Sequence, residues 1–391
     1  MRRILSMIEG PLRLIWGAGA AAVSLLALFE APTWDLFRAA VVATEWGHLL
    51  ALAALAPLLP GWRRTRAGQV GGALGIGAAL VALTPLLRAL PVAQALPAQL
   101  AAAFGPPPPE LGRPAPLVAA DLLRGVALPE GEPTALIFGE ADGQRLDLDF
   151  YPAQGATAPA PLLVVVHGGA WQGGDKSEMP ALSRYLAGRG YAVAAVNYRL
   201  APRWPFPAAR DDVRAAVAYL KGRAAELGVD PTRIALCGRS AGGQIALLVA
   251  YTADDPAIRG AISFYGPTDM VYGYAHPSNP LVLNSTEALE FYLGGPPERL
   301  PAAYAAASPI SFVGQRTPPT LLIHGRRDEL VFFRQSQLLD AALSAADRPH
   351  LLLDLPWATH AADFNFSGPS GQISTYAIEH FLGTVMLNVE L

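Results

Sequence analysis

A serine between glycines is the residue of this sequence best placed to do chemistry. Ser240 lies in the G-x-S-x-G pentapeptide Gly238-Arg239-Ser240-Ala241-Gly242, directly after the apolar run at 234–237 and directly before a helix-forming stretch. A serine on such a sharp strand-to-helix turn forms a nucleophile elbow, in which the glycines let neighbouring backbone approach without Cβ clashes. Its hydroxyl then projects over a helix N-terminus, which favours developing negative charge. We therefore expect Ser240 to be a catalytic nucleophile.

A glycine-rich loop upstream fits the same chemistry. The apolar run at 161–166 predicts a fully buried strand, and it ends in the sequence His167-Gly168-Gly169-Ala170-Trp171. Acyl transfer places negative charge on the former carbonyl oxygen, and backbone N–H groups of a glycine-rich turn can bind that charge at short range. We expect the N–H groups of Gly169, Ala170 and Ala241 to form this oxyanion hole.

An acid and a base follow in the order that a catalytic triad requires. Asp328 comes after the predicted strand at 319–325, and His360 comes after the predicted strand at 350–355. The chain order Ser240, Asp328, His360 is that of α/β-hydrolases and differs from the orders of chymotrypsin-like and subtilisin-like enzymes. We expect His360 to act as the base and Asp328 to orient it.

Other titratable residues near these motifs have weaker claims. Asp328 is preferred as the acid because its spacing after the strand is the one that this position requires. His167 and His324 lie beside glycine turns, where structural hydrogen bonding is the more common role. The remaining candidates for the acid are Glu329, Asp354 and Asp363.

Four sequence motifs together resemble those of a known family. They are His167–Trp171, Asn197–Pro202 with Phe206–Ala208 following, Asp230–Ile234, and Gly238–Gly243. Between about residues 133 and 387 the chain resembles the hormone-sensitive-lipase-like esterases of the α/β-hydrolase superfamily. The tryptophan of the H-G-G-x-W loop, with Gly174-Asp175-Lys176 after it, is most similar to the branch of feruloyl-esterase-like carboxylesterases and kynurenine formamidases. The resemblance implies a serine hydrolase of small to medium acyl esters that needs no metal or organic cofactor.

Two departures from the family pattern concern the walls of the site. Ala170 stands where the lipase-type loop has its third glycine, so the backbone donor is kept but the fit around short acyl groups changes. After the base, the chain reads Ala361-Ala362-Asp363-Phe364, where many relatives have glycine and phenylalanine. We expect the apolar walls of the substrate pocket to be Trp171, Tyr265, Trp357 and Phe364.

The pattern of strands and helices predicts an α/β fold, with a mostly parallel, doubly covered sheet as in α/β-hydrolases. We expect a hairpin at 135–138 and 146–151, and further strands at 192–196, 234–237 and 261–264, alternating with helices at 181–188, 208–227 and 242–251. The aromatic, proline-rich stretch at 268–313 separates two of the predicted strands. An insertion at that point would overhang the site.

Charge is scarce at the N-terminal end of the chain. Only 16% of the 391 residues are charged, below the roughly 25% of ordinary soluble proteins, and the deficit concentrates in the first ninety residues. A membrane span needs about twenty apolar residues. We expect three spans, at 13–30, 38–63 and 67–87, so that an all-α membrane region precedes the hydrolase. Glu45 and His48 are awkward in the second span, and we expect a packing or interfacial role for Glu45.

The basic residues orient this membrane region. Arginines precede the first span and follow the second, whereas the connection at 30–35 is acidic, so the positive-inside rule places the basic segments in the cytoplasm. Three spans in an inner membrane then place the hydrolase outside the cytoplasm. The uncharged stretch at 89–109 is the alternative, because a fourth crossing there would return the hydrolase to the cytoplasm. A surface-lying helix is the preferred interpretation of that stretch.

These observations divide the chain into three parts. They are a membrane region at 1–90, a proline-rich linker with short amphipathic helices at 91–133, and a catalytic domain at 134–391. The expected partners are an acyl ester and a lipid bilayer, and a homo-oligomer is compatible with the sequence. A net charge of −3 without a basic stripe argues against nucleic-acid binding. An acyltransferase or a formamidase-like amidase would use the same triad.

Overall fold

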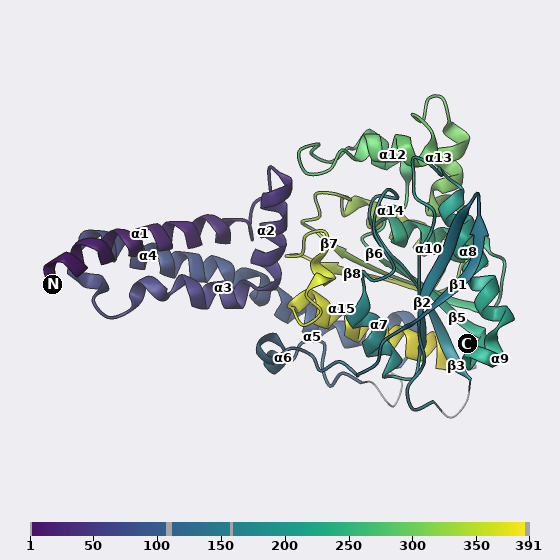
Figure 1. The fold of residues 1–391 in the computed structure, drawn as a ribbon, viewed down its shortest axis with the longest axis horizontal. Helices are drawn as coiled ribbons and strands as arrows, with labels where there is room; N and C mark the ends of the chain where they lie inside the picture. The colour runs from purple at the N-terminus through teal and green to yellow at the C-terminus, as the bar shows by residue number, and fades with distance from the viewer. Residues whose placement is uncertain (1, 107–111, 157–158, 388–391) are drawn as a thin grey trace.

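The computed structural model describes residues 2–106, 112–156 and 159–387. A helical bundle projects from an α/β domain built around one sheet (Figure 1). Most of the proline run at 106–109, which is part of the proline-rich linker expected at 91–133, lies outside the described residues.

The sheet has eight strands in the order β1-β2-β4-β3-β5-β6-β7-β8. Strand β2 pairs antiparallel with β1 and β4, and the pairs from β4 to β8 are parallel. The strands are β1 Thr134–Ala141, β2 Gln144–Tyr151, β3 Ala160–Val166, β4 Ala192–Val196, β5 Val229–Arg239, β6 Ile258–Phe264, β7 Thr320–Gly325 and β8 His350–Leu355. The mostly parallel sheet predicted from the sequence is therefore present.

The first hairpin has the turn that its residues favour. Asp142 and Gly143 both have positive φ, of 51° and 73°, between the paired residues Ala141 and Gln144. A two-residue turn with positive φ at both positions matches the twist of the flanking strands, and Asp-Gly is among the pairs that adopt it most readily.

Strand β3 shows how the sheet is covered on both faces. Leu162 and Val164 point into one core, whose helical side includes α8 (Ala208–Gly222) and α10 (Ala241–Thr252). Leu163 and Val165 point into the other core, where α7 (Pro180–Ala187) and α15 (Pro369–Leu382) pack. Successive side chains of a strand alternate between faces, so a continuous apolar run requires burial on both sides.

Helix α5 (Thr84–Phe104) belongs to the second of these cores. Leu96, Leu100 and Phe104 are buried there, and the Phe104 ring meets that of Phe381 on α15 edge to face at 4.9 Å. The surface-lying helix expected over 89–109 was therefore wrong, and the stretch does not cross as a fourth span either. Its buried apolar face makes α5 part of the domain, although it precedes the expected start at residue 134.

The bundle consists of α1 (Arg2–Leu25), α3 (Gly47–Ala54) and α4 (Arg66–Ala82). Figure 1 shows these helices side by side and projecting from the domain, with α2 (Trp34–Glu45) crossing their ends next to it. By length and hydropathy one helix could cross a membrane, at Arg66–Phe104, and α2 with the segment Gly47–Leu58 passes the same test only as a pair bent by 90°. The second expected span is thus two short helices at a right angle and not one straight helix.

The remaining α-helices lie in the α/β domain and its connections, whereas two short helical turns, η1 and η2, join α3 to α4 in the bundle. Three of them, α11, α12 and α13, form the overhang predicted at 268–313, which we call the cap (Figure 1). The α-helices are α6 Ala119–Arg124, α9 Ala224–Leu227, α11 Met270–Ala275, α12 Ser285–Leu293, α13 Pro301–Ala307 and α14 Arg334–Ala345, and short turns of helix are η1 Ala56–Leu58, η2 Trp62–Arg64, η3 Pro309–Phe312, η4 Ala362–Phe364 and η5 Gly383–Leu387.

Candidate active site

Ser240 lies on the sharp turn between β5 and α10. Its φ of 53° and ψ of −121° fall outside the ordinary regions for a residue with a side chain. The turn is possible because Gly242 has no Cβ: a Cβ there would lie 2.2 Å from the carbonyl oxygens of Val166 and His167. The nucleophile elbow predicted from the pentapeptide is therefore present in its geometry, with strain concentrated at the serine.

The glycine-rich loop after β3 lies against this turn. Gly169 and Ala170 both have positive φ, of 104° and 51°, and Ala170 lines the same cleft as Ser240 and Ala241. Among the described residues, the backbone N–H groups of Gly169, Ala170 and Ala241 have no hydrogen-bond partner. Three free donors beside a serine form an arrangement that can bind an oxyanion.

The acid and the base meet as expected. His360 Nδ1 lies 2.6 Å from Asp328 Oδ2, and both side chains are buried. No hydrogen bond joins Ser240 Oγ to His360 within the described part of the chain. Such bonds are often loose in unliganded enzymes and tighten when substrate binds. The structure therefore contains a preformed acid–base pair.

Asp328 is held in its ionised form. Burial alone would raise the pKa of this carboxyl, but the charge of His360 and hydrogen bonds from His324 and His360 bring the pKa well below its ordinary value. Backbone N–H groups of Leu330 and Val331 also donate to Oδ1, at 2.9 and 2.8 Å. A carboxylate with this many donors stays charged and keeps its orientation.

His324 has a larger part in the site than its position beside a glycine turn indicated. Its Nε2 lies 3.1 Å from Asp328 Oδ2 and 2.8 Å from the Val331 carbonyl, while Nδ1 lies 2.7 Å from Ser336 Oγ. The side chain is a structural hydrogen-bonder, as predicted, and what it supports is the acid of the candidate triad.

The rival acids are occupied elsewhere. Glu329 accepts hydrogen bonds from the backbone N–H of Ala31, at 2.9 and 3.2 Å, and so contacts the N-terminal region. Asp354 pairs with Arg326 on the surface. Asp363 pairs with the buried Arg239. None of the three contacts His360, which leaves Asp328 as its acidic partner among the described residues.

A second buried ion pair joins the nucleophile turn to the loop of the base. Arg239, next to Ser240, donates through Nε to Asp363 at 2.9 Å, and both side chains are more than nine-tenths buried. Tyr265 donates its hydroxyl to the same carboxylate, and its ring lies 4.2 Å from that of His360. Burial raises the pKa of Tyr265 well above its ordinary value, so the phenol stays protonated as a donor. This network holds the Tyr265 ring against one face of the His360 ring.

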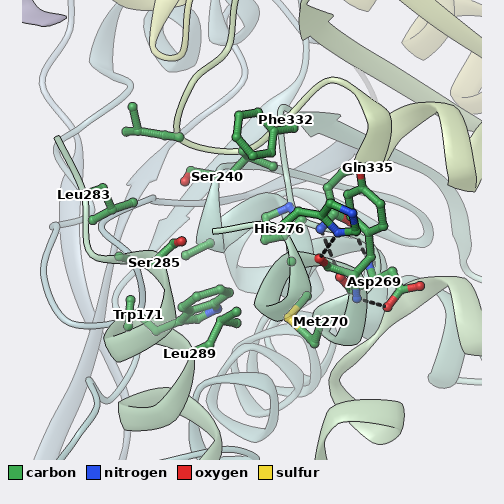
Figure 2. A pocket seen from close by; sticks show the side chains of 18 residues that line it. Trp171, Ser240, Asp269, Met270, His276, Leu283, Ser285, Leu289, Phe332 and Gln335 are labelled. Carbon is green, nitrogen blue, oxygen red and sulfur yellow. Dashed lines mark hydrogen bonds between the residues drawn. The ribbon is translucent and has the colours of Figure 1, made fainter. Parts of the chain in front are cut away.

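The cleft over Ser240 is roofed by the cap (Figure 2). The cavity between its walls has a volume of about 50 Å³. The Ser240 hydroxyl faces this space, as Figure 2 shows, and most of the surrounding side chains are apolar. The labelled side chains around it are Trp171, Asp269, Met270, His276, Leu283, Ser285, Leu289, Phe332 and Gln335.

The four expected pocket walls have different positions. Trp171 does line the cleft, with its ring stacked on Tyr292 at 4.3 Å. Trp357 lies outside it as a core residue, fully buried, with its indole N–H bonded to Ser370. Tyr265 backs His360, and Phe364 lies over Arg239 beside a separate hollow. A loop position near the base does not specify on which side of the loop a side chain packs.

The cap supplies the cleft residues that sequence reasoning missed. His276 faces the cleft and stacks on Tyr272 at 4.0 Å, and Met270 and Leu289 form apolar wall. A pattern in the sequence could have identified His276. His276 is the histidine of the aromatic stretch predicted to overhang the site.

Comparisons with known proteins agree with this geometry. Residues 148–343, half of the chain, match the BD-FAE family. The chain is 31% identical over 261 residues to the probable carboxylic ester hydrolase LipM of Mycobacterium tuberculosis, covering 63% of this chain and 59% of that protein. It is 31% identical to the esterase LipC of the same organism, over 64% of each chain. The chain thus spans less than two thirds of these curated relatives.

Solved structures show the same fold. Esterase 2 of Thermogutta terrifontis, phosphonylated by sarin, superposes with a TM-score of 0.56 at 24% identity, covering 66% of this chain and 97% of that one. A truncated carbohydrate esterase from gut microbiota superposes with a TM-score of 0.53 at 20% identity, covering 64% and 97%. Given the matched residues and this shared fold, the chain belongs to the BD-FAE family of α/β-hydrolase proteins.

Proposed function

We propose that this protein is a membrane-anchored serine carboxylesterase that hydrolyses small to medium acyl esters. The observation that carries the proposal is a strained Ser240 at an apolar cleft that Ala170 and Ala241 also line, with the His360–Asp328 pair on adjoining loops, of which Leu330 and Val331 border the same cleft. Relatives named as esterases and carboxylic ester hydrolases support ester hydrolysis.

The residues suggest a two-step mechanism. His360 takes the proton from Ser240 as the serine oxygen attacks the acyl carbon, and Asp328 offsets the charge that forms on the imidazole. The N–H groups of Ala170 and Ala241, with that of Gly169, bind the oxyanion. Collapse of this intermediate releases the alcohol with a proton from His360. Water activated by His360 then hydrolyses the acyl-enzyme and frees the carboxylic acid.

The shape of the site fits this chemistry. An apolar cleft binds the acyl part of the ester and limits access of water, while the donors act only at the oxygen where charge develops. His360, oriented by Asp328, supplies the proton transfers in this mechanism.

A p-nitrophenyl ester series tests the proposal. The full-length protein in detergent is assayed from acetate to palmitate beside Ser240→Ala, with Ser344→Ala, an exposed serine of α14, as the matched control. We expect Ser240→Ala to lose about 10⁵-fold or more in kcat while Ser344→Ala keeps its activity. Near-full activity in Ser240→Ala would overturn the assignment.

The bundle is proposed to hold the enzyme in the bacterial inner membrane. The continuous helix Arg66–Phe104, which begins with α4, is long and apolar enough to cross a membrane, and α1 and α3 pack beside α4. Arg13, Arg63 and Arg64 gather at the end of the bundle that is remote from the domain, where Arg13 donates to the carbonyls of Pro57 and Leu59. The positive-inside rule places that end in the cytoplasm and the hydrolase outside it.

Two measurements test the anchor. Extraction of membranes with alkaline carbonate should leave the protein in the pellet. Alkaline phosphatase fused to the C-terminus should be active, because that reporter works only outside the cytoplasm. Release by carbonate would contradict the anchor, and an inactive but intact fusion would contradict the orientation.

A further inference from the structure

The loop that carries Asp328, which we call the acid loop, lies between the cleft over Ser240 and the N-terminal region. Leu330 and Phe332, which follow Asp328, line the cleft together with Leu283 of the cap. Phe332 also lines a second hollow of about 290 Å³, whose other walls are Glu30, Ala31, Pro32, Asn279 and Glu329. The two hollows therefore meet at one partly buried aromatic side chain, and the second is built jointly by the cap, the acid loop and residues 30–32.

Hydrogen bonds fix residues 26–34 to the hydrolase on both sides of this hollow. Arg327 donates to the carbonyls of Leu26 and Phe29, at 3.1 and 2.7 Å, and Glu329 accepts from the N–H of Ala31. On the cap side, the N–H of Trp34 donates to the Leu281 carbonyl at 3.0 Å, and Asn279 donates to the Pro32 carbonyl at 3.1 Å. The α1–α2 connection is thus fixed against the hydrolase, and we call this connection, together with residues 279–281 of the cap, the rim.

The outer surface of this rim is apolar. Phe29 is 62% exposed, Trp34 47% and Leu281 68%, and Leu28 and Leu36 are exposed as well. Exposed large apolar side chains gathered in one place mark contact with another molecule or a membrane. This surface continues the apolar outside of α1, on which Ile15 and Leu25 are exposed.

The direction of α2 places this rim at a membrane surface. If α1 and α4 cross the bilayer, α2 lies along its surface, because it makes an angle of 90° with the following segment. Trp34, near the polar Asp35, is typical of the interface, where an aromatic ring is partly apolar and partly hydrated.

We propose that the enzyme takes its substrate from the bilayer: a neutral amphiphilic ester whose acyl chain passes from the lipid, between the α1–α2 connection and the cap, into the cleft over Ser240. This inference rests on the proposed esterase function and names its substrate class. The apolar rim lets the chain leave the lipid without entering water. Glu30 and Glu329 at the second hollow disfavour an anionic head group, so the ester that fits is an uncharged one, such as a monoacylglycerol.

The position of the rim is tested by fluorescence. Leu281→Cys is labelled with an environment-sensitive dye, and the native Cys237 does not compete because it is fully buried. Ile137→Cys on edge strand β1, exposed at 55%, is the matched control. In phosphatidylcholine vesicles we expect a blue shift and quenching by brominated lipid at position 281 and not at 137. An unshifted, unquenched dye at 281 in protein that floats with the vesicles overturns the proposal.

The substrate class is tested by kinetics. Phe29→Ser with Trp34→Ser is compared with Ile137→Ser, using monooleoylglycerol in phosphatidylcholine vesicles and p-nitrophenyl acetate in water. We expect fatty-acid release from the vesicles to fall at least tenfold in the double variant, with acetate hydrolysis within about twofold of the parent protein and Ile137→Ser unchanged. Lipid access is contradicted if the double variant and the parent protein release fatty acid from vesicles at equal rates. It is also contradicted if the double variant loses activity equally on both substrates. If the parent protein shows no Ser240-dependent hydrolysis of either ester, the esterase proposal itself fails.

Discussion

The bundle and the hydrolase are packed by opposite means. In the hydrolase, large side chains such as Trp357, Phe381 and Leu162 fill the interior. In the bundle, the buried cluster consists of alanines, and glycines bring helix backbones into contact. Of the 28 large apolar side chains exposed among the described residues, 19 precede residue 91. Large groups outside and small groups inside suit a lipid solvent, because lipid gives apolar side chains no reason to be buried.

Two adjacent carboxylates, Asp328 and Glu329, serve different regions of the molecule. Asp328 holds His360, whereas Glu329 holds Ala31. We expect Asp328→Asn to lower kcat by about 10⁴-fold, since an asparagine favours the wrong imidazole tautomer. Glu329→Gln should cost less than about tenfold, because its partner lies outside the reacting groups. Steady-state kinetics on p-nitrophenyl acetate measures both losses. Equal losses in the two variants would contradict this division of roles between Asp328 and Glu329.

The next largest effect should come from the buried pair of the hydrolase. Asp363→Asn leaves Arg239 buried without its carboxylate, and breaking such a pair costs about 3–5 kcal/mol. The matched control is Asp354→Asn, whose partner Arg326 is 59% exposed, so that its loss should cost about 1 kcal/mol or less. Thermal unfolding of the two variants in detergent measures the difference. Similar midpoints would mean that the buried network does not stabilise the fold.

A glycine of the bundle should show a smaller effect confined to that region. A Cβ on Gly71 would lie 2.4 Å from the Arg13 carbonyl, whereas one on Gly77 meets nothing within 4 Å. We expect Gly71→Leu to destabilise the bundle by about 1–3 kcal/mol, as overpacking usually does, and Gly77→Leu to have no effect. The rate of tryptic cleavage at Arg63 and Arg64 reports this, with acetate hydrolysis unchanged. Equal cleavage rates in the two variants would contradict the close contact.

The smallest effect concerns pH at the junction. Burial, together with the charge of Glu30, raises the pKa of Glu329 to about 7, from an ordinary value of 4.5. A raised pKa means that the folded state binds the proton more tightly, so the stability from this group is present below pH 4.5 and is lost as the pH rises through 7. Amide exchange at Ala31, corrected for its intrinsic pH dependence, should therefore quicken between pH 5.5 and 8. Glu329→Gln should remove this change, and an unchanged pH profile in that variant would contradict it.

Local patterns predicted the centre of the molecule well. The buried strand before the H-G-G-x-W loop and the elbow at Ser240 depend on residues close in sequence, and the acid and the base each follow a strand that its own apolar run predicts. Features made by distant segments were missed: the docking of α5 against Phe381, the burial of Trp357 and the bend between α2 and α3. An uncharged helix has the same composition in a lipid bilayer as in a protein core, so composition alone did not separate α5 from a surface or membrane helix.

Glu45, the last residue of α2, was expected to have a packing or interfacial role, and it is buried against a helix from the other end of the chain. Its carboxylate accepts hydrogen bonds from the N–H and the hydroxyl of Ser370, at 3.1 and 2.7 Å, in the first turn of α15, while His48 bonds to the Leu122 carbonyl. A carboxylate at a helix N-terminus satisfies free N–H groups and the helix dipole.

This contact determines the order in which the protein can be completed during synthesis. Glu45 leaves the ribosome 325 residues before its partner, so the carboxylate stays solvated or transiently paired until nearly the whole chain has been made. Helix α5 likewise waits for α15 to cover its apolar face. Insertion of the N-terminal helices therefore comes first and closure of the hydrolase last, and a nascent chain stalled before α15 would leave both surfaces open to chaperones and proteases.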